Sequence, residues 1–166
     1  MNIFDKGFSP SEAQVRYLDG DFVVVWASEG QDMDGSWGIY GQRFDSMGRF
    51  VGGEFQINSN TVNDQVAPTV AMDNRGNFVV AWASQGQSFS YFNDIRAQVY
   101  GSDGQRLGSE IRVNSANIPG TSVNPSSNEV HPTVSVSEVG TFVVSWTAAF
   151  SQKNGVTTDT VVMARL

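Results

Sequence analysis

The pattern of apolar positions is dominated by one short run that occurs three times along the chain. It reads FVVVW at 22–26, FVVAW at 78–82 and FVVSW at 142–146, and each copy follows a glycine placed two residues before its phenylalanine. Self-similarity of this kind is typical of proteins built from repeated structural units. The sequence therefore predicts three copies of one unit.

Each unit is predicted to contain four short strands that follow one another in a meander. Turn residues (Asp, Asn and Gly) separate the apolar stretches, as at 45–48 and 73–76, and these residue types suit tight reversals. The expected first strands are 14–18, 69–73 and 133–137, the second strands are the FVVxW runs, the third strands are 39–44, 95–100 and 161–166, and the fourth strands are 54–58 and 110–114.

The FVVxW runs are apolar at nearly every position, which predicts that both of their faces are covered by protein. The third and fourth strands alternate instead, as in the stretch 95–99. Sheets stacked face to face, as in the blades of a β-propeller, cover their inner strands in this way. We therefore expect an all-β fold of three four-stranded antiparallel repeats that form propeller blades, with a β-trefoil or a β-prism as the alternatives.

The whole chain, 1–166, is expected to form a single repeat domain. The repeats cover about 13–58, 67–114 and 131–166, and the third lacks a fourth strand that the segment 1–5 could supply. Closed propellers have about 4 to 8 blades. Three blades therefore predict a homo-oligomer, most simply a dimer that gives six blades.

The motifs of the repeat resemble a tandem repeat of large bacterial secreted and surface proteins, which often also carry calcium-binding nonapeptide repeats. They are GxFVVxWxSxGQ at 20–31, GIYGQRFD at 38–45, GGEFQIN at 52–58 and DQxxP at 64–68. The third copy departs from this pattern, because Thr147 to Phe150 replace the residues that follow the tryptophan in the other copies. The resemblance implies a secreted or cell-surface location and a non-catalytic adhesive or scaffolding role.

Composition narrows the possible partners. The net charge is −7, from 17 acidic and 10 basic residues, so the surface repels nucleic acids and anionic membranes. No stretch of about 18 apolar residues could cross a membrane, and the start of the chain lacks the pattern of a secretion signal. There is no cysteine, which excludes disulfides, thiolate nucleophiles and cysteine-based zinc sites.

Two loops with aromatic residues are the candidate ligand-binding sites. Trp37 and Tyr40 lie in the first copy, and Phe89, Tyr91 and Phe92 lie in the corresponding loop of the second copy. Aromatic rings among polar residues suit contacts with glycans or with a surface protein. The alternative is that these rings cap the stack of blades.

Asp32 and Asp34 are the candidate metal ligands. Their alternate spacing before a glycine resembles an oxygen-ligand calcium loop, although the further ligands of an EF-hand are missing. The alternative is a solvated turn. No cofactor is required by the sequence, and calcium is the one ion for which it offers ligands.

Residues that could act in catalysis are interpreted as structural. His131 takes the position of Ala67 in the second copy, and a place that accepts either residue is interpreted as structural. Glu54 recurs as Glu110, whereas a catalytic group is needed only once. The sequence thus favours a non-catalytic extracellular binding module for a carbohydrate or a surface protein. The alternatives are a self-assembling scaffold and, third, a propeller enzyme similar to glycoside hydrolases.

Overall fold

A computed structural model describes residues 10–18, 20–32, 35–86, 93–114, 127–152 and 155–164. Every regular element in these ranges is a β-strand, and none of them contains a helix long and apolar enough to cross a membrane. The first sheet contains β1 (Pro10–Leu18), β2 (Asp21–Glu29), β3 (Trp37–Phe44) and β4 (Phe50–Gln56). The second contains β5 (Gln65–Met72), β6 (Phe78–Gln85), β7 (Asn93–Tyr100) and β8 (Arg106–Arg112), and the third contains β9 (Ser127–Val136), β10 (Phe142–Gln152) and β11 (Gly155–Ala164).

The predicted all-β meander is confirmed. Strands follow one another in chain order within each sheet, and every pairing is antiparallel. The predicted number of strands is only partly met, because the third sheet has three strands among the described residues. The segment 1–5, expected to supply its fourth strand, lies outside the described residues.

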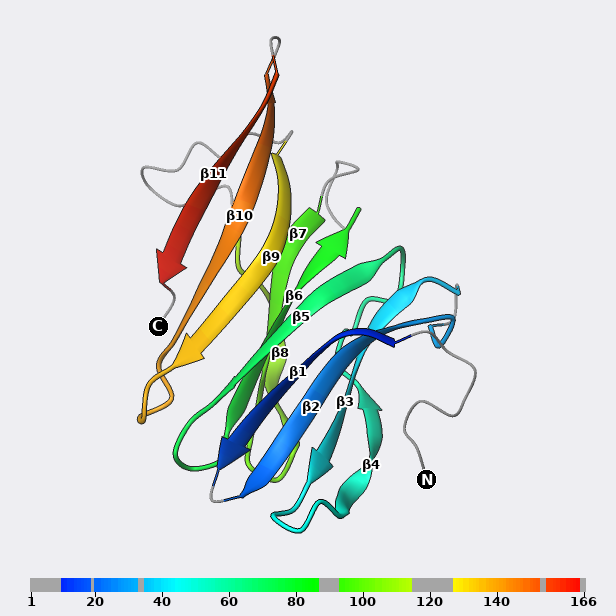
Figure 1. Cartoon of the computed structure of the whole chain (residues 1–166), viewed down its shortest axis with the longest axis vertical. Coiled ribbons are helices and arrows are strands. Elements are labelled where there is room, and N and C mark those ends of the chain that lie inside the picture. The colour runs from blue at the N-terminus through cyan, green and yellow to red at the C-terminus, as the bar shows by residue number, and fades with distance from the viewer. Residues whose placement is uncertain are drawn as a thin grey trace.

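The three sheets form a stack with the second sheet in the middle (Figure 1). Among the first strands of the sheets, β5 lies between β1 and β9 and contacts both, and the three strands run in the same direction. They are the inner strands of the stack, from which the three sheets spread apart. This is the arrangement of neighbouring blades in a propeller.

Each sheet has two faces, which we name after the FVVxW run. The tryptophan face carries Trp26, Trp82 or Trp146, and the valine face carries Val23, Val79 or Val143.

Two apolar clusters lie between the sheets. The first joins the tryptophan face of the second sheet to the valine face of the first, with Val23, Val25, Ala27, Ile39, Ile57, Val70, Phe78, Val80, Trp82 and Tyr100 buried. The second joins the tryptophan face of the third sheet to the valine face of the second, with Ala71, Val79, Ala81, Ala83, Ile95, Ala97, Val113, Val134, Val144 and Trp146 buried.

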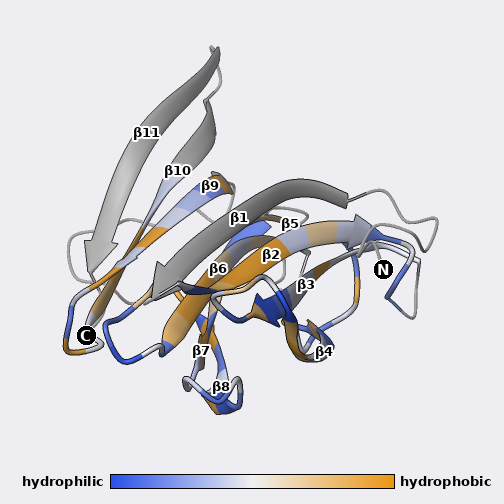
Figure 2. Cartoon of the chain, turned by 60° about the horizontal axis from the view of Figure 1, so that its bottom comes forward, coloured by the Kyte–Doolittle hydropathy of each residue, from blue (hydrophilic) through white to orange (hydrophobic). Residues whose placement is uncertain are grey.

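Burial of the FVVxW run on both faces is confirmed only in the second copy. Every residue of β6 from Phe78 to Ser84 is buried, and hydrophobic residues are concentrated along β2 and β6 (Figure 2). Val24 and Val143, in the first and third copies, are only partly buried. In these two copies the burial is incomplete, because their sheets lie at the ends of the stack and only one face meets another sheet of the chain; Trp26 on the outer face of the first sheet is nevertheless buried.

The turns form as their residue types predict. The reversals at 45–48 and 73–76 each close on a hydrogen bond from a glycine N–H to an aspartate carbonyl, Gly48 to Asp45 (2.8 Å) and Gly76 to Asp73 (3.1 Å). Both glycines have positive φ, 75° and 83°, which glycine adopts without the steric cost that a side chain adds.

Candidate functional site

Each inner strand is interrupted by a bulge at the same place in the repeat. The pairing of β5 with β6 shifts between Val66 and Thr69, and that of β1 with β2 shifts between Ser11 and Gln14. In the third sheet the pairing of β9 with β10 shifts between Val130 and Thr133. Bulges re-aim side chains and are common next to active sites.

The backbone at two of these bulges is left-handed although the residues are not glycines. Ala67 has a φ of 54° and His131 a φ of 52°, and a proline follows each of them. An L-residue in this conformation costs about 1–2 kcal/mol, and such conformations cluster at functional sites. His131 is exposed, whereas Pro132 beside it is buried.

The register identifies the corresponding residue of the first sheet as Glu12. Ser11 pairs with Ala27 and Gln14 with Val25, as Val66 pairs with Ala83 and Thr69 with Ala81. We refer to Glu12, Ala67 and His131 as the axial positions. They place an acidic residue and a histidine, far apart in the sequence, at the same position of the repeat on the two inner strands that contact β5.

The predicted metal ligand Asp32 lies in a buried hydrogen-bonded cluster. Its Oδ1 accepts a hydrogen bond from the Tyr40 hydroxyl (2.7 Å) and one from Gln56 Nε2, and its Oδ2 accepts one from Asn58 Nδ2 (3.2 Å). Both carboxylate oxygens are therefore bonded to protein donors. Asp34 lies outside the described residues, and no group of three or more metal-ligating side chains occurs in the part of the chain that the structure describes.

The second sheet builds the same kind of cluster around Asp94. Its Oδ1 accepts hydrogen bonds from Arg112 Nη2 (2.8 Å) and Asn114 Nδ2 (3.2 Å), and its Oδ2 lies 3.6 Å from Arg96 Nη2. Both units thus contain a buried carboxylate that accepts a hydrogen bond from the recurring asparagine. The sequence repeat does not show that the two carboxylates correspond, because Asp94 aligns with Gly38 and not with Asp32.

The recurring asparagines extend the edge of the third strand. Asn58 Oδ1 accepts a hydrogen bond from the Ile39 N–H (2.8 Å), and Asn114 Oδ1 accepts one from the Ile95 N–H (3.0 Å). A side chain here takes the place of a backbone carbonyl. This explains why the fourth strand of the motif ends in asparagine.

Glu54 and Glu110 recur in the sequence but have different partners. Glu54 Oε1 accepts a hydrogen bond from Gln31 Nε2 (2.8 Å). Glu110 Oε2 accepts hydrogen bonds from the backbone N–H (2.9 Å) and the hydroxyl (2.6 Å) of Ser59, which links the second sheet to the loop after β4. Their contacts hold loops in place, and in each unit the contact is a different one.

Of the predicted aromatic residues, the structure describes Trp37 and Tyr40. Trp37 is partly buried, and its backbone N–H donates a hydrogen bond to Asp64 Oδ1 (3.2 Å). Tyr40 is buried; this burial, its hydrogen bond to Asp32 and the charges of Asp32 and Glu54 raise the pKa of its hydroxyl well above the ordinary value of 10.0. Tyr40 therefore stays a protonated donor, and its ring offers no exposed platform. Phe89, Tyr91 and Phe92 lie outside the described residues.

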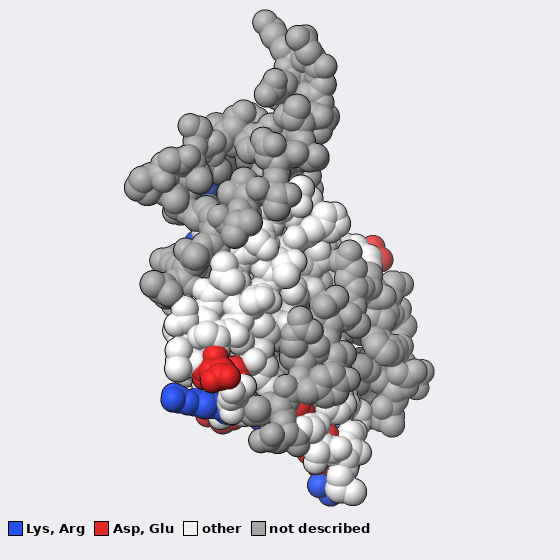
Figure 3. Space-filling model, turned by 60° about the vertical axis from the view of Figure 1, so that its left-hand side comes forward, with Lys and Arg blue, Asp and Glu red and all other residues white. Residues whose placement is uncertain are grey.

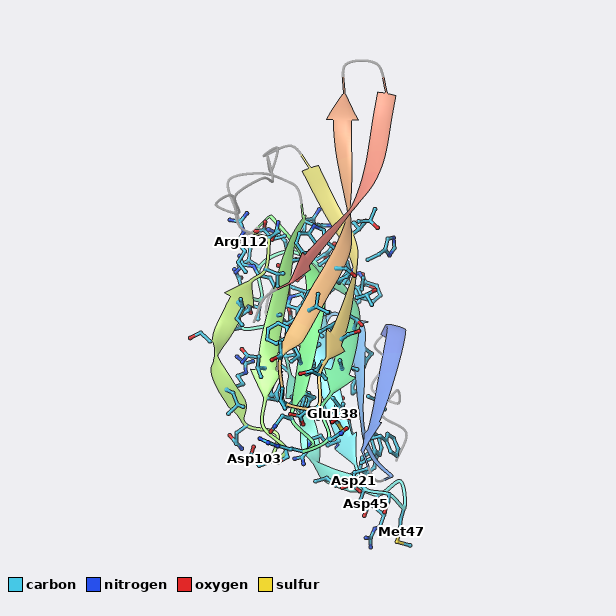
Figure 4. The ribbon with its side chains drawn as sticks, turned by 90° about the vertical axis from the view of Figure 1, so that its left-hand side faces the viewer. Asp21, Asp45, Met47, Asp103, Arg112 and Glu138 are labelled. Atoms are coloured by element: carbon cyan, nitrogen blue, oxygen red, sulfur yellow. The ribbon has the colours of Figure 1, made fainter. Side chains whose placement is uncertain are left out.

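Several acidic turn residues gather at one end of the strands. Asp21, Asp45, Asp103 and Glu138 lie toward that end, and Arg112 lies toward the other (Figure 4). On the side of the molecule seen in Figure 3, charged atoms of both signs lie at the end with these turns, and Arg49 forms an ion pair with Asp45. The middle of the described surface in that view is uncharged.

The fold is similar to that of several glycoside hydrolases of known structure. An endo-arabinase from Bacteroides thetaiotaomicron matches over 100% of this chain with a TM-score of 0.58 and 17% identity. An α-L-arabinofuranosidase from Lactobacillus brevis matches over 92% with a TM-score of 0.57 and 14% identity, and a thermostable family-43 glycoside hydrolase over 98% with a TM-score of 0.54 and 15% identity. No family model matches the chain, and no curated protein matches its sequence.

The chain spans 59%, 52% and 62% of the length of these three structures. The identities are too low to show more than a shared fold, which is a propeller. The likeness supports the predicted propeller over the trefoil and the prism.

The comparisons contradict two predictions about function. The chain was expected to be a non-catalytic binding module and not an enzyme, but the propellers that it resembles are glycoside hydrolases, and sialidases also match. His131 was interpreted as structural because Ala67 takes its place in the second copy. The side chains at these two positions differ, but both residues have left-handed backbone, which the sequence pattern does not show.

Proposed function

We propose that this chain provides three blades of a carbohydrate-active propeller of the glycoside hydrolase type, with its site along the inner strands. The observation that carries the proposal is the bulge repeated in β1, β5 and β9, with left-handed backbone at Ala67 and His131. The arabinases and family-43 hydrolases that share the fold supply the class of reaction and of substrate.

Hydrolysis of a glycosidic bond needs two catalytic groups that flank that bond. One protonates the leaving oxygen as a general acid, and the other either removes a proton from the attacking water as a general base or attacks the sugar carbon as a nucleophile. In this proposal Glu12 supplies a carboxyl group and His131 an imidazole, and histidine is the side chain most often used in general acid–base catalysis. Ala67, on the strand between them, carries only a methyl side chain.

The cost of the left-handed backbone supports a functional role for these positions. A glycine at Ala67 and at His131 would remove most of that cost, yet neither position carries one. Strain that persists in two copies at the same register indicates that the bulge has a purpose besides stability. An extracellular location is part of the same proposal, since sugar polymers do not cross membranes.

The proposal is tested with aryl glycosides of L-arabinofuranose and of sialic acid, by following release of the aryl alcohol. We expect Glu12→Gln and His131→Ala each to lower kcat/KM by about a hundredfold or more, the usual contribution of a general acid or base. Glu138→Gln, in an exposed turn away from the axial positions, is the matched control and should leave the rate unchanged. A folded wild-type protein that releases no aryl alcohol from any substrate would overturn the proposal.

A further inference from the structure

The two contacts between sheets within the chain follow one rule. Val80, Trp82 and Tyr100 on the tryptophan face of the second sheet pack on the valine face of the first. Val144 and Trp146 on the tryptophan face of the third sheet pack on the valine face of the second. In both cases a tryptophan face meets the valine face of the preceding unit.

Polar contacts fasten the first of these interfaces at its edges. Arg106 Nη2 donates to the carbonyl oxygens of Gln56 and Ile57, both at 3.0 Å, and Arg43 Nη1 donates to the carbonyl oxygen of Asp103 (2.6 Å). The interface thus combines an apolar centre with hydrogen bonds to backbone at its rim, the anatomy of a specific protein interface.

The tryptophan face of the first sheet is built for the same contact. Phe44 stacks on Phe22 with ring centroids 4.7 Å apart at 8°, and Tyr100 stacks on Phe78 at 4.8 Å and 7°. The same aromatic pair therefore exists in both units. In the second unit it meets Phe55 of the first sheet, since the Phe55 and Tyr100 ring centroids lie 5.6 Å apart.

The exposure of this face differs from that of its counterpart. Val80 and Tyr100 are 0% and 1% exposed, whereas Val24 and Phe44 at the same positions are only partly buried. Phe50, which contacts Phe44 with ring centroids 5.3 Å apart, is 49% exposed. Trp26 and Tyr40 on this face are buried, at 2% and 6% exposed, so its accessible apolar part is the end that carries Phe44 and Phe50.

The opposite end of the stack offers the complementary surface. Val143, Ser145 and Thr147 lie on the valine face of the third sheet and are partly buried, whereas Val79 and Ala81 at the first two of these positions are buried. These side chains are small, as are those that receive a tryptophan face in the second sheet.

We propose that the tryptophan face of the first sheet docks on the valine face of the third sheet of a second copy of this chain. Two copies related by a two-fold axis would make two such contacts and close a ring of six blades, within the usual range of 4 to 8. The inner strands of both copies would then surround one axis. The dimer rests on the faces of the sheets and does not depend on the proposed hydrolytic activity.

The experiment measures the mass of the chain in solution by light scattering during size-exclusion chromatography. The expected result for the wild type is twice the 18.0 kDa of one chain. Val24→Lys on one face and Ser145→Lys on the other should each weaken the dimer by about a hundredfold or more, because each buries a charge in the contact. Leu107→Lys is the control. This exposed residue belongs to the second sheet, which lies between the other two sheets and takes no part in the proposed contact, so the dimer should remain intact.

Mixing the two variants distinguishes this contact from a face docked on itself. A mixed dimer of Val24→Lys and Ser145→Lys keeps one unaltered contact, so association should partly return. Near-ultraviolet circular dichroism checks that each variant is folded, and Phe50→Asp replaces Val24→Lys if that variant is not. A monomeric wild type, or a folded Val24→Lys or Phe50→Asp variant that dimerises like the wild type, would overturn the proposal.

Discussion

The carboxylate of Asp32 occupies the space that a side chain at Gly38 would need. A Cβ at position 38 would lie 2.6 Å from Asp32 Cγ. In the second unit the residue aligned with Gly38 is Asp94, which supplies the buried carboxylate itself. The two units thus satisfy the same asparagine with a carboxylate from different places in the sequence.

This relationship predicts that Gly38→Asp rescues the loss of Asp32. Asp32→Ala should lower the free energy of unfolding by about 3 kcal/mol, because the buried Tyr40 hydroxyl loses its acceptor and Asn58 loses one of its acceptors. Gly38→Asp alone should also destabilise, since the new carboxylate would collide with Asp32. Urea unfolding of the double variant should recover most of the loss.

The matched control for these variants is Glu138→Ala, in an exposed turn, which should change the free energy of unfolding by less than about 0.5 kcal/mol. A double variant less stable than both single variants would show that the two carboxylates do not share one place.

Tyr100 predicts a loss of stability at high pH. Its burial, with a smaller contribution from the charge of Glu110 and against the effect of Arg106, raises its pKa to about 12 from 10.0. Between these values the native state holds a proton that the unfolded chain has released, so stability is present below pH 10 and falls as the pH rises to 12. Tyr100→Phe should reduce this loss by about 2–3 kcal/mol, as measured by urea unfolding at several pH values.

Phe44 is the reason that Tyr100→Phe should fold normally, since it makes the same stack in the first unit. At pH 7 the variant and the wild type should have similar stability. An equal loss of stability in both proteins between pH 10 and 12 would contradict the assignment to Tyr100.

Asp73 predicts a loss of stability at low pH. Burial raises the pKa of its carboxyl, but hydrogen bonds from the Asn77 side chain and from the N–H groups of Arg75 and Asn77 outweigh it, so the pKa lies below the ordinary 3.8. A lowered pKa adds stability above pH 3.8, and that stability is lost as the pH falls through the native value. Asp73→Asn should flatten this part of the pH profile, as measured by urea unfolding at several pH values.

The left-handed backbone at the axial positions predicts that a glycine stabilises the protein. Ala67→Gly and His131→Gly should each raise the free energy of unfolding by about 0.5–1 kcal/mol, because the relief of the steric cost exceeds the entropy that glycine loses on folding. Ala81→Gly in the buried centre of β6 is the control and should lower stability. Thermal or urea unfolding that shows Ala67→Gly to be as destabilising as Ala81→Gly would contradict this.

The repeat, most of the strands and their turns can be predicted from local patterns in the sequence. The FVVxW runs and the Asp-to-Gly reversals at 45–48 and 73–76 act through neighbours in the chain, so their conformation follows from local pattern. The antiparallel meander follows for the same reason, since each strand pairs with the next. The first strand of the second unit was predicted to begin at residue 69. In the structure β5 begins at Gln65 and continues through a bulge, so the predicted strand was too short at its start.

Which surfaces are covered, and which residues meet, depends on how the three sheets pack together. Val24 and Val80 are the same residue in the same motif, yet one is partly buried and the other fully buried, because only the second sheet lies between two others. Asp32 reaches the place of Gly38 through loop geometry, and Glu12 and His131 take the same place beside a bulge in their sheets. Such contacts depend on how distant segments pack, and a local pattern carries no information about that.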